Sequence, residues 1–486
     1  MKAIKYIPGL FIFLLLPFWA HTQGDTMTIH LQEAIDLVQL RSVRFKRLAL
    51  DKLEADTRYS LFQKSRRPSL SLFMDLPQYN QSFTSVTQPD GGLVYQFVRQ
   101  NESNFGLQAT QLINRTGGVV FIQSNLQRFD DFEQGNYSFN SIPLSFGFEQ
   151  SIGAFNPLKW QRRSAELERN HGRSKYTQES ILIAAEASRK YFDCLFSQVN
   201  LEIAKKNYSV YKDLLDIASK RLELGQISKS EYLQLDLQVK SMSLSQENSM
   251  QDLRIAQSEL LRLLNMDGQL DFKLVSPSKD IPLMYIDESK VVDLFLANNP
   301  ELIRQKLSII QADRDIDEAK KSYSPKAELQ MYFGSSSSGT DLDLLYRDAE
   351  MQQNISLRLQ LPIVNWGMGR EQLKLAKAKK DLTLIENERN LDNGLMDLRL
   401  KVQQFNLLAT QLELLEQADW IASDRFKILE KKYRIDPISV FELIQARMDK
   451  DTAKRSLILA WKTYWTTYYE LCALAQYDFI LSKSLN

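Results

Sequence analysis

The sequence predicts a mainly α-helical chain with membrane β-barrel strands. Long helical hairpins follow the strands, and the arrangement occurs twice in the chain as a two-fold internal repeat. Two observations support this fold class. Two helical runs of 66 residues each, 159–224 and 370–435, end at short turns from which a second helix returns. Each is preceded by runs of alternating apolar residues, which is typical of strands with one apolar and one polar face.

Charge and composition exclude several classes of function. The 61 basic and 60 acidic residues give a net charge of +1, which does not provide the concentrated basic surface of a nucleic-acid-binding protein. The histidines and cysteines have no metal-ligand spacing, and the sequence contains no glycine-rich phosphate loop or nucleophile motif. We therefore expect no enzyme activity, no cofactor, no metal site and no nucleic-acid partner.

Residues 1–23 have the parts of a secretory signal peptide, with Lys2 and Lys5 before an apolar segment at 10–16 and a polar stretch after it. The apolar segment is too short to span a bilayer as a stable helix. No later stretch approaches the run of about 18 apolar residues that a membrane-spanning helix needs. We expect an exported chain that enters a membrane, if it does, as a closed β-barrel.

Matching residues reveal the repeat. An offset of 257 residues aligns Pro68 with Pro325, and an offset of 211 aligns Gly225 with Asp436. The first copy therefore has 46 more residues between its two alternating strands than the second copy has. The predicted segments are a first copy at 24–284, with strands at 69–77 and 142–152 and a hairpin at 159–266, and a second copy at 285–486, with strands at 326–334 and 354–363 and a hairpin at 370–477.

Four strands in one chain are too few to close a membrane barrel, whereas three chains would supply twelve. Since unpaired strand edges cannot face lipid, we expect a homo-oligomer. Glu149 and Arg358 fall on the polar phase of their strands, and we expect them in the barrel lumen; a position in the interfacial ring is the alternative. Turn signals at 88–92 and 114–118, with strand-like runs beside them, predict an additional hairpin within 78–141.

A 66-residue helix is roughly 100 Å long at about 1.5 Å per residue, a length that suits a spacer between two bilayers. Apolar residues recur at three- and four-residue steps, so we expect coiled-coil packing. At the first turn, Gly225 permits the unusual backbone of a helix end, and Leu224 and Ile227 are expected as exposed apolar contacts. Ser228 and Glu231 have the spacing of a capping box.

Cys194 and Cys472 both lie in apolar helical runs. Buried free thiols are the simpler interpretation. A disulfide is the alternative, because the two residues lie 31 and 36 positions from the turns of their hairpins and would reach similar heights along straight helices. Height alone does not determine which helices are neighbours, so both interpretations stay open.

Three features together resemble the TolC-like outer membrane efflux protein family over about residues 28–481. They are the strand-to-helix junctions at 148–157 and 359–367, the tip at 221–228 followed by Glu231, and the two-fold repeat. The resemblance implies a homotrimer with a twelve-stranded barrel in the outer-membrane lipid of a Gram-negative bacterium and a large periplasmic part built of helices. It also implies a passive gated duct that docks onto a periplasmic adaptor protein and, through it, an inner-membrane pump.

By the same resemblance, the two hairpin tips are the adaptor-docking sites. The first tip comprises Leu224, Gly225, Gln226, Ile227 and Ser228, and the second comprises Ile435, Asp436, Pro437, Ile438 and Ser439. The second tip departs from the family pattern, because Asp436-Pro437 replaces the usual glycine. The arginine–aspartate links of some family gates are also missing by position, and this leaves Tyr433 and Glu442 as candidates for the periplasmic gate.

A periplasmic adaptor or coiled-coil scaffold without a channel is the alternative function. Adaptors usually have one hairpin flanked by small β-domains and an anchor. Two hairpins and amphipathic strands favour the channel. The sequence does not indicate the exported cargo or the class of pump.

Overall fold

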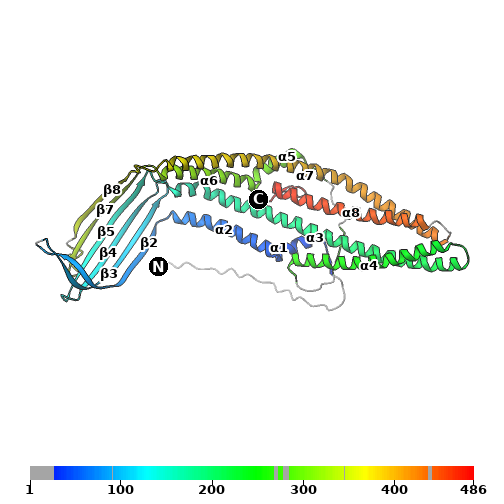
Figure 1. Ribbon diagram of the computed structural model, residues 1–486, viewed down its shortest axis with the longest axis horizontal. Helices are drawn as coiled ribbons and strands as arrows, with labels where there is room; N and C mark the ends of the chain where they lie inside the picture. The colour runs from blue at the N-terminus through cyan, green and yellow to red at the C-terminus, as the bar shows by residue number, and fades with distance from the viewer. Residues whose placement is uncertain are drawn as a thin grey trace, which may run out of the picture.

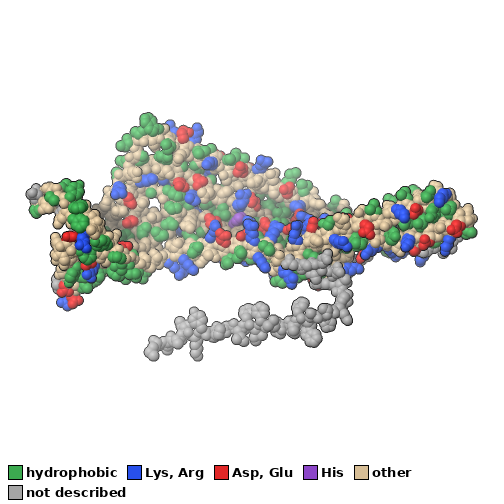
Figure 2. Space-filling view, turned by 60° about the horizontal axis from the view of Figure 1, so that its bottom comes forward, with side chains coloured by type: hydrophobic (Ala, Val, Ile, Leu, Met, Phe, Trp, Pro, Cys, Tyr) green, Lys and Arg blue, Asp and Glu red, His purple; other side chains and the backbone are tan. Residues whose placement is uncertain are grey.

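The computed structural model describes residues 27–89, 91–266, 272–276, 284–343, 345–347, 349–435 and 440–485. It is an elongated molecule with a β-sheet at one end and the turns of two helical hairpins at the other (Figure 1). Acidic and basic side chains are interspersed along the helical part (Figure 2). The predicted signal peptide at 1–23 lies outside the described residues.

The helices occur in pairs of matching length. The short pairs are α1 Leu31–Arg41 with α5 Glu288–Asn298, of 11 residues each, and α2 Val43–Ser65 with α6 Pro300–Ser322, of 23 residues each. The long pairs are α3 Pro157–Glu223 with α7 Met368–Ile435, of 67 and 68 residues, and α4 Lys229–Leu264 with α8 Val440–Ala475, of 36 residues each. Within the described residues, no helix combines the length and the apolar character that crossing a membrane requires.

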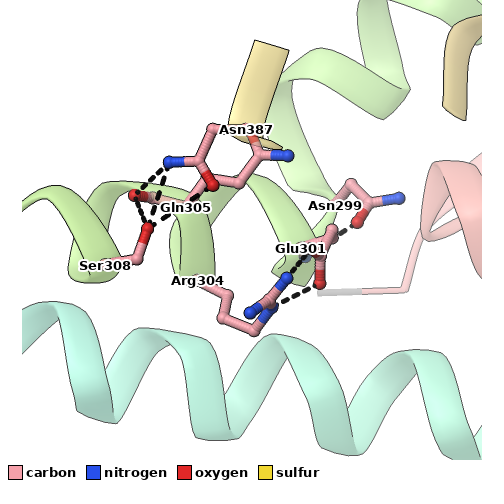
Figure 3. Close-up of polar contacts among 6 residues, drawn as sticks. All are labelled: Asn299, Glu301, Arg304, Gln305, Ser308 and Asn387. Atoms are coloured by element: carbon pink, nitrogen blue, oxygen red, sulfur yellow. Dashed lines mark hydrogen bonds and ion pairs between the residues drawn. The ribbon is translucent and has the colours of Figure 1, made fainter. Parts of the chain in front are cut away.

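Polar side chains fix where α6 begins and hold it against α7 (Figure 3). The chain turns between α5 and α6 at Asn299, whose side chain accepts a hydrogen bond of 2.8 Å from the backbone N–H of Glu301. On α7, Asn387 donates to the hydroxyl of Ser308 at 3.1 Å and to the carbonyl of Gln305 at 3.3 Å. The bonds of Asn387 hold α6 and α7 together, and both helices run side by side toward the sheet.

The main hydrophobic core lies in the middle of the molecule, where both hairpins meet the short helices. Two short strands, β1 Met27–Ile29 and β6 Phe272–Leu274, pair in parallel beside it. The hydroxyl of Tyr191 lies 3.0 Å from the carbonyl of Ile29 and 2.6 Å from that of Val275, so α3 is tied to this pair of strands. A last pair, β9 Tyr477–Asp478 and β10 Lys483–Ser484, follows α8.

Cys194 and Cys472 are both free thiols buried in this core. Burial raises the pKa of each thiol to about 12. The structure therefore supports buried thiols and not the alternative of a disulfide.

One antiparallel sheet holds six strands in the order β2-β3-β4-β5-β7-β8. Their bounds are β2 Ser69–Thr87, β3 Leu93–Ile113, β4 Gly118–Asp131, β5 Asn136–Ile152, β7 Lys326–Gly339 and β8 Glu350–Gln360. The additional hairpin predicted within 78–141 is confirmed as β3 and β4. The expectation of four sheet strands in one chain is wrong, because this hairpin pairs within the sheet between β2 and β5.

Aromatic rings lie over glycines on both sides of the added hairpin. Phe73 on β2 is paired with Gly106 on β3, and Phe121 on β4 is paired with Gly147 on β5. A Cβ atom on either glycine would lie 2.0 Å from the facing ring, so only glycine leaves room for it. The two ring–glycine pairs fix the register of the hairpin against its neighbours.

We expect Gly106→Val to weaken the sheet, because the new side chain must displace the ring of Phe73. Overpacking of this kind costs about 1–3 kcal/mol. The free energy of unfolding in detergent, measured by circular dichroism with increasing urea, checks the loss. Gly339→Val on β7 is the matched control, since a Cβ there meets only Leu345 at 3.9 Å. Equal losses in both variants would contradict the role of the ring–glycine pair.

Candidate functional site at the hairpin tips and the sheet

The first tip is a compact turn between α3 and α4. Gly225 has a φ of +69°, the left-handed region that glycine adopts without strain, and a Cβ there would meet nothing within 4 Å. The N–H of Gln226 donates to the carbonyl of Arg221 at 2.8 Å, which closes the end of α3. The sequence therefore ends one helix and starts the next within five residues, 224–228.

The predicted capping box at the start of α4 is confirmed. The hydroxyl of Ser228 accepts a hydrogen bond of 3.2 Å from the N–H of Glu231, and the carboxylate of Glu231 accepts one of 2.8 Å from the N–H of Ser228. The hydrogen bonds that the N–H and the hydroxyl of Ser228 donate to the Glu231 carboxylate lower the pKa of that carboxyl. The tip is thus held by its own backbone and side chains.

The two apolar residues of this tip differ in exposure. Leu224 is 71% exposed and points away from the hairpin core. Ile227, by contrast, is partly buried and packs against the cluster of Tyr211, Ala218 and Leu235. The expectation that both residues are exposed is therefore correct for Leu224. It is wrong for Ile227, because α3 and α4 pack on its side chain.

At the second tip, α7 ends at Ile435 and α8 begins at Val440. Asp436, Pro437, Ile438 and Ser439 lie outside the described residues.

The two gate candidates lie in different environments. Tyr433 is 2% exposed and packs against Leu214 of α3 and Phe426 of α7. The guanidinium of Arg221 lies 5.3 Å from its ring centre, and burial raises the pKa of its hydroxyl. Glu442 is exposed and lines a groove of about 500 Å³ between α7 and α8. Tyr433 is therefore part of a buried contact between helices, whereas Glu442 faces an open groove.

Two polar contacts near the tips were not predicted from the sequence. An exposed ion pair of 2.7 Å joins Arg425 of α7 to Asp449 of α8, and Gln445 donates to the same carboxylate at 3.0 Å. Deeper between the hairpins, Asn207 of α3 donates to buried Asp451 of α8 at 2.7 Å. The sequence around Asp451 gave no signal of this buried link, because its helical neighbours Arg447 and Arg455 are charged as on a solvent-exposed face.

Glu149 and Arg358 share one face of the sheet. Glu149 on β5 pairs with Gln330 on β7, two residues from Glu328, and Glu328 pairs with Arg358 on β8. The carboxylate of Glu328 lies 4.0 Å from the guanidinium of Arg358. This face is opposite to the one that carries the apolar residues. Among the described residues there is no group of three or more side chains of the kind that binds a metal ion.

Residues 291–475 match the family model described as outer membrane efflux protein. Among curated proteins, the chain is 23% identical over 237 residues to the probable outer membrane lipoprotein SilC of Salmonella typhimurium, covering 48% of this chain and 50% of that protein. It is 19% identical over 280 residues to the cation efflux system protein CusC of Escherichia coli K12, covering 57% and 60%. The alignments thus span only half to three fifths of these two relatives.

Solved structures share the fold along nearly the whole chain. The crystal structure of CusC has a TM-score of 0.62 at 14% identity and covers 94% of this chain and 95% of that one. The outer membrane channel CmeC of Campylobacter jejuni has a TM-score of 0.63 at 15% identity and covers 98% and 93%. Residues 291–475 thus resemble the outer membrane efflux protein family in sequence, and nearly the whole chain shares its fold with solved outer membrane channels.

Proposed function

We propose that the chain is the outer-membrane channel of a tripartite efflux or secretion system, a passive gated duct from the periplasm to the exterior. One observation carries the proposal: every strand of the sheet places exposed apolar side chains on the same face. Six such side chains, one from each strand, are Leu72, Leu107, Ile122, Phe146, Phe333 and Leu357. An apolar outer face with a polar inner face is the pattern of a barrel wall that separates lipid from water.

A homotrimer is supported first by the edges of the sheet. β2 and β8 are its outermost strands, so one side of each has no partner among the described residues. Lipid cannot satisfy free backbone N–H and C=O groups. Pairing β8 of one chain with β2 of the next closes the wall, and three chains complete it.

An apolar stripe on α7 supports the same assembly. Leucine or isoleucine recurs every seventh residue and is half exposed or more at each position, namely Leu400, Leu407, Leu414, Ile421 and Ile428. On α4, Leu237 and Leu244 have the same spacing and are exposed. Because α3 and α8 lie between them, α4 and α7 flank the chain, and the stripe of one protomer is placed to pack on α4 of its neighbour.

Docking is proposed at the hairpin tips. Exposed Leu224, on a turn held by Gly225 and the capping box, offers a rigid apolar contact to the helical hairpin of a periplasmic adaptor, which couples the channel to an inner-membrane pump. Ile435 to Ser439 are proposed as the second docking tip. For the gate, we propose that Tyr433 holds α7 against α3 and that Glu442 lines the entrance beside Arg425.

The alternative, a periplasmic adaptor or scaffold, has less support. A scaffold has no use for a single sheet with an exposed apolar face and a polar face. The paired hairpins also differ from the single hairpin that the alternative expects. We therefore retain the channel, in the outer membrane of a Gram-negative bacterium with a large periplasmic part, as the proposal.

Ile421→Asp on α7 is expected to dissociate the trimer, because it buries an unpaired charge in the interface at a cost of several kcal/mol. Light scattering coupled to size-exclusion chromatography in detergent gives the mass. Lys427→Asp, on the same helix but outside the stripe, is the control and should stay trimeric. A trimer in both variants would contradict the proposed packing of α7.

Leu224→Asp is expected to lower adaptor cross-linking at the first tip at least tenfold, since a charged group cannot enter an apolar groove. A photoreactive amino acid at Gln226 captures the partner in living cells, and the yield is read on gels. Leu481→Asp, equally exposed but far from the tip, is the control. Unchanged yield with Leu224→Asp would exclude this tip from the docking surface.

If Glu149 and Arg358 line the lumen, neutralising them shifts ion selectivity in opposite directions. Glu149→Gln removes a negative charge and should lower the preference for cations, whereas Arg358→Gln should raise it. Reversal potentials across planar bilayers in a potassium chloride gradient measure both. A shift in the same direction, or none, would place the two side chains outside the ion path.

A further inference from the structure

The six strands of one chain imply a pore wall larger than four strands build. We propose that β3 and β4 are wall strands, so that three chains close an eighteen-stranded barrel whose outer-membrane bore is too wide to limit the size of the cargo. This inference rests on the proposed trimeric channel. It concerns the hairpin formed by the residues that the first half of the chain has in excess over the second.

The hairpin is paired along its length on both sides. β2 pairs with β3 from Ser69↔Thr110 to Thr87↔Leu93, with one irregularity beyond Asp75. β4 pairs with β5 from Val119↔Glu149 to Asp131↔Asn136. A hairpin that lay inside the lumen as a plug, or above the membrane as a loop, would leave β2 and β5 to pair directly.

The hairpin also continues the two faces of the sheet. Its apolar side chains Phe105, Leu107 and Ile122 lie on the face that carries Leu72 and Phe146. Its opposite face carries amide and hydroxyl groups and two carboxylates, namely Glu102, Gln108, Thr110, Gln123, Asn125, Gln127 and Asp131. Both faces match those of the neighbouring strands, as a lipid–water boundary requires.

Hydrogen bonds anchor the inner turn of the hairpin at the level where the strands become helices. Asn156, which caps the N-terminus of α3, donates to the carbonyls of Asn114 and Arg115 at 3.4 Å each. Gln111 donates at 2.9 Å to the carbonyl of Arg66, at the end of α2. The turn is therefore fixed to the starts and ends of the helices, and the hairpin spans the full depth of the wall.

Circumference favours six strands in a chain. With strands about 4.8 Å apart and tilted by about 40°, six strands occupy roughly 38 Å of the wall and four strands roughly 25 Å. The four helices that meet the sheet, α2, α3, α6 and α7, occupy roughly 32–40 Å at an interaxial distance of about 8–10 Å. The wider wall therefore continues the helical ring without a step.

The number of strands determines which cargo can pass through the outer-membrane end of the proposed barrel. Barrel diameter grows roughly linearly with strand number, so eighteen strands give about 1.5 times the diameter of twelve, and barrels of 16–18 strands hold an aqueous channel. Bulky hydrated cargo passes such a bore, and its polar lining is mostly uncharged on the added hairpin. Size selection then falls to the hairpin tips at the other end.

Spin labels test the width and the place of the hairpin in the trimer, in a background with Cys194→Ala and Cys472→Ala. Labels at Ser356→Cys, on the polar face of β8, should lie roughly 30 Å apart in an eighteen-stranded barrel and roughly 20 Å apart in a twelve-stranded one, by dipolar spectroscopy. At Leu107→Cys the label should be accessible to oxygen dissolved in lipid. At Gln108→Cys it should be accessible to a water-soluble nickel chelate.

Leu357→Cys and Ser356→Cys on β8 are the matched lipid and water controls. A distance of roughly 20 Å between the Ser356→Cys labels would overturn the wide barrel. So would a label at Leu107→Cys that is accessible to the nickel chelate while the label at Leu357→Cys is accessible to oxygen in lipid. Neither result would contradict the proposed channel. If the Ser356→Cys labels show no coupling and Leu357→Cys shows no lipid contact, the proposed trimeric channel itself is wrong.

Discussion

Each strand of the sheet presents N–H and C=O groups that lipid cannot satisfy, and within one chain these groups are paired on both sides of β3, β4, β5 and β7. Only β2 and β8 have a side without a partner in the described residues. In the proposed trimer, assembly, the direction of the helices and the placement of the tips would all follow from closing this sheet. The helices continue from strands whose positions the backbone pairing fixes, so an error of register in the sheet would misplace the far end of the molecule.

The residues between β5 and α3 and those between β8 and α7 connect the sheet to the long helices. Asn156 bonds to the first turn of α3 through the N–H of Lys159 and to the inner turn of the added hairpin through its amide group. On the second half, Gly367 has a φ of +81° just before α7 begins. Asn156 and Gly367 thus mark the points at which a strand spacing of about 4.8 Å meets a helix spacing of about 8–10 Å.

Local signals predicted most of the elements, because helix periodicity, strand alternation and capping spacing are encoded in neighbouring residues. The turn signals at 88–92 and 114–118, with strand-like runs beside them, even indicated the added hairpin. Its place in the sheet was missed because strand pairing joins residues far apart, and because β3 is polar in both phases around Asn101 and Glu102. The exposure of Ile227 was misjudged for the same reason, since only the packing of α3 on α4 decides which side of a turn is covered.

The two ends of the molecule differ in how they are held, and this bears on where a channel of this kind opens. The sheet is stabilised by continuous backbone pairing, whereas the hairpins near their tips share two small apolar clusters and a few polar links. The turn of the first hairpin is closed by bonds within itself, so it can move as a unit. Separating α7 from α3 would break the contact of Arg221 with Tyr433 but would leave the capping box of Ser228 intact. In the proposed channel, opening at the tips would therefore break side-chain contacts and no backbone pairing, and it would leave the strand pairing of the sheet unchanged.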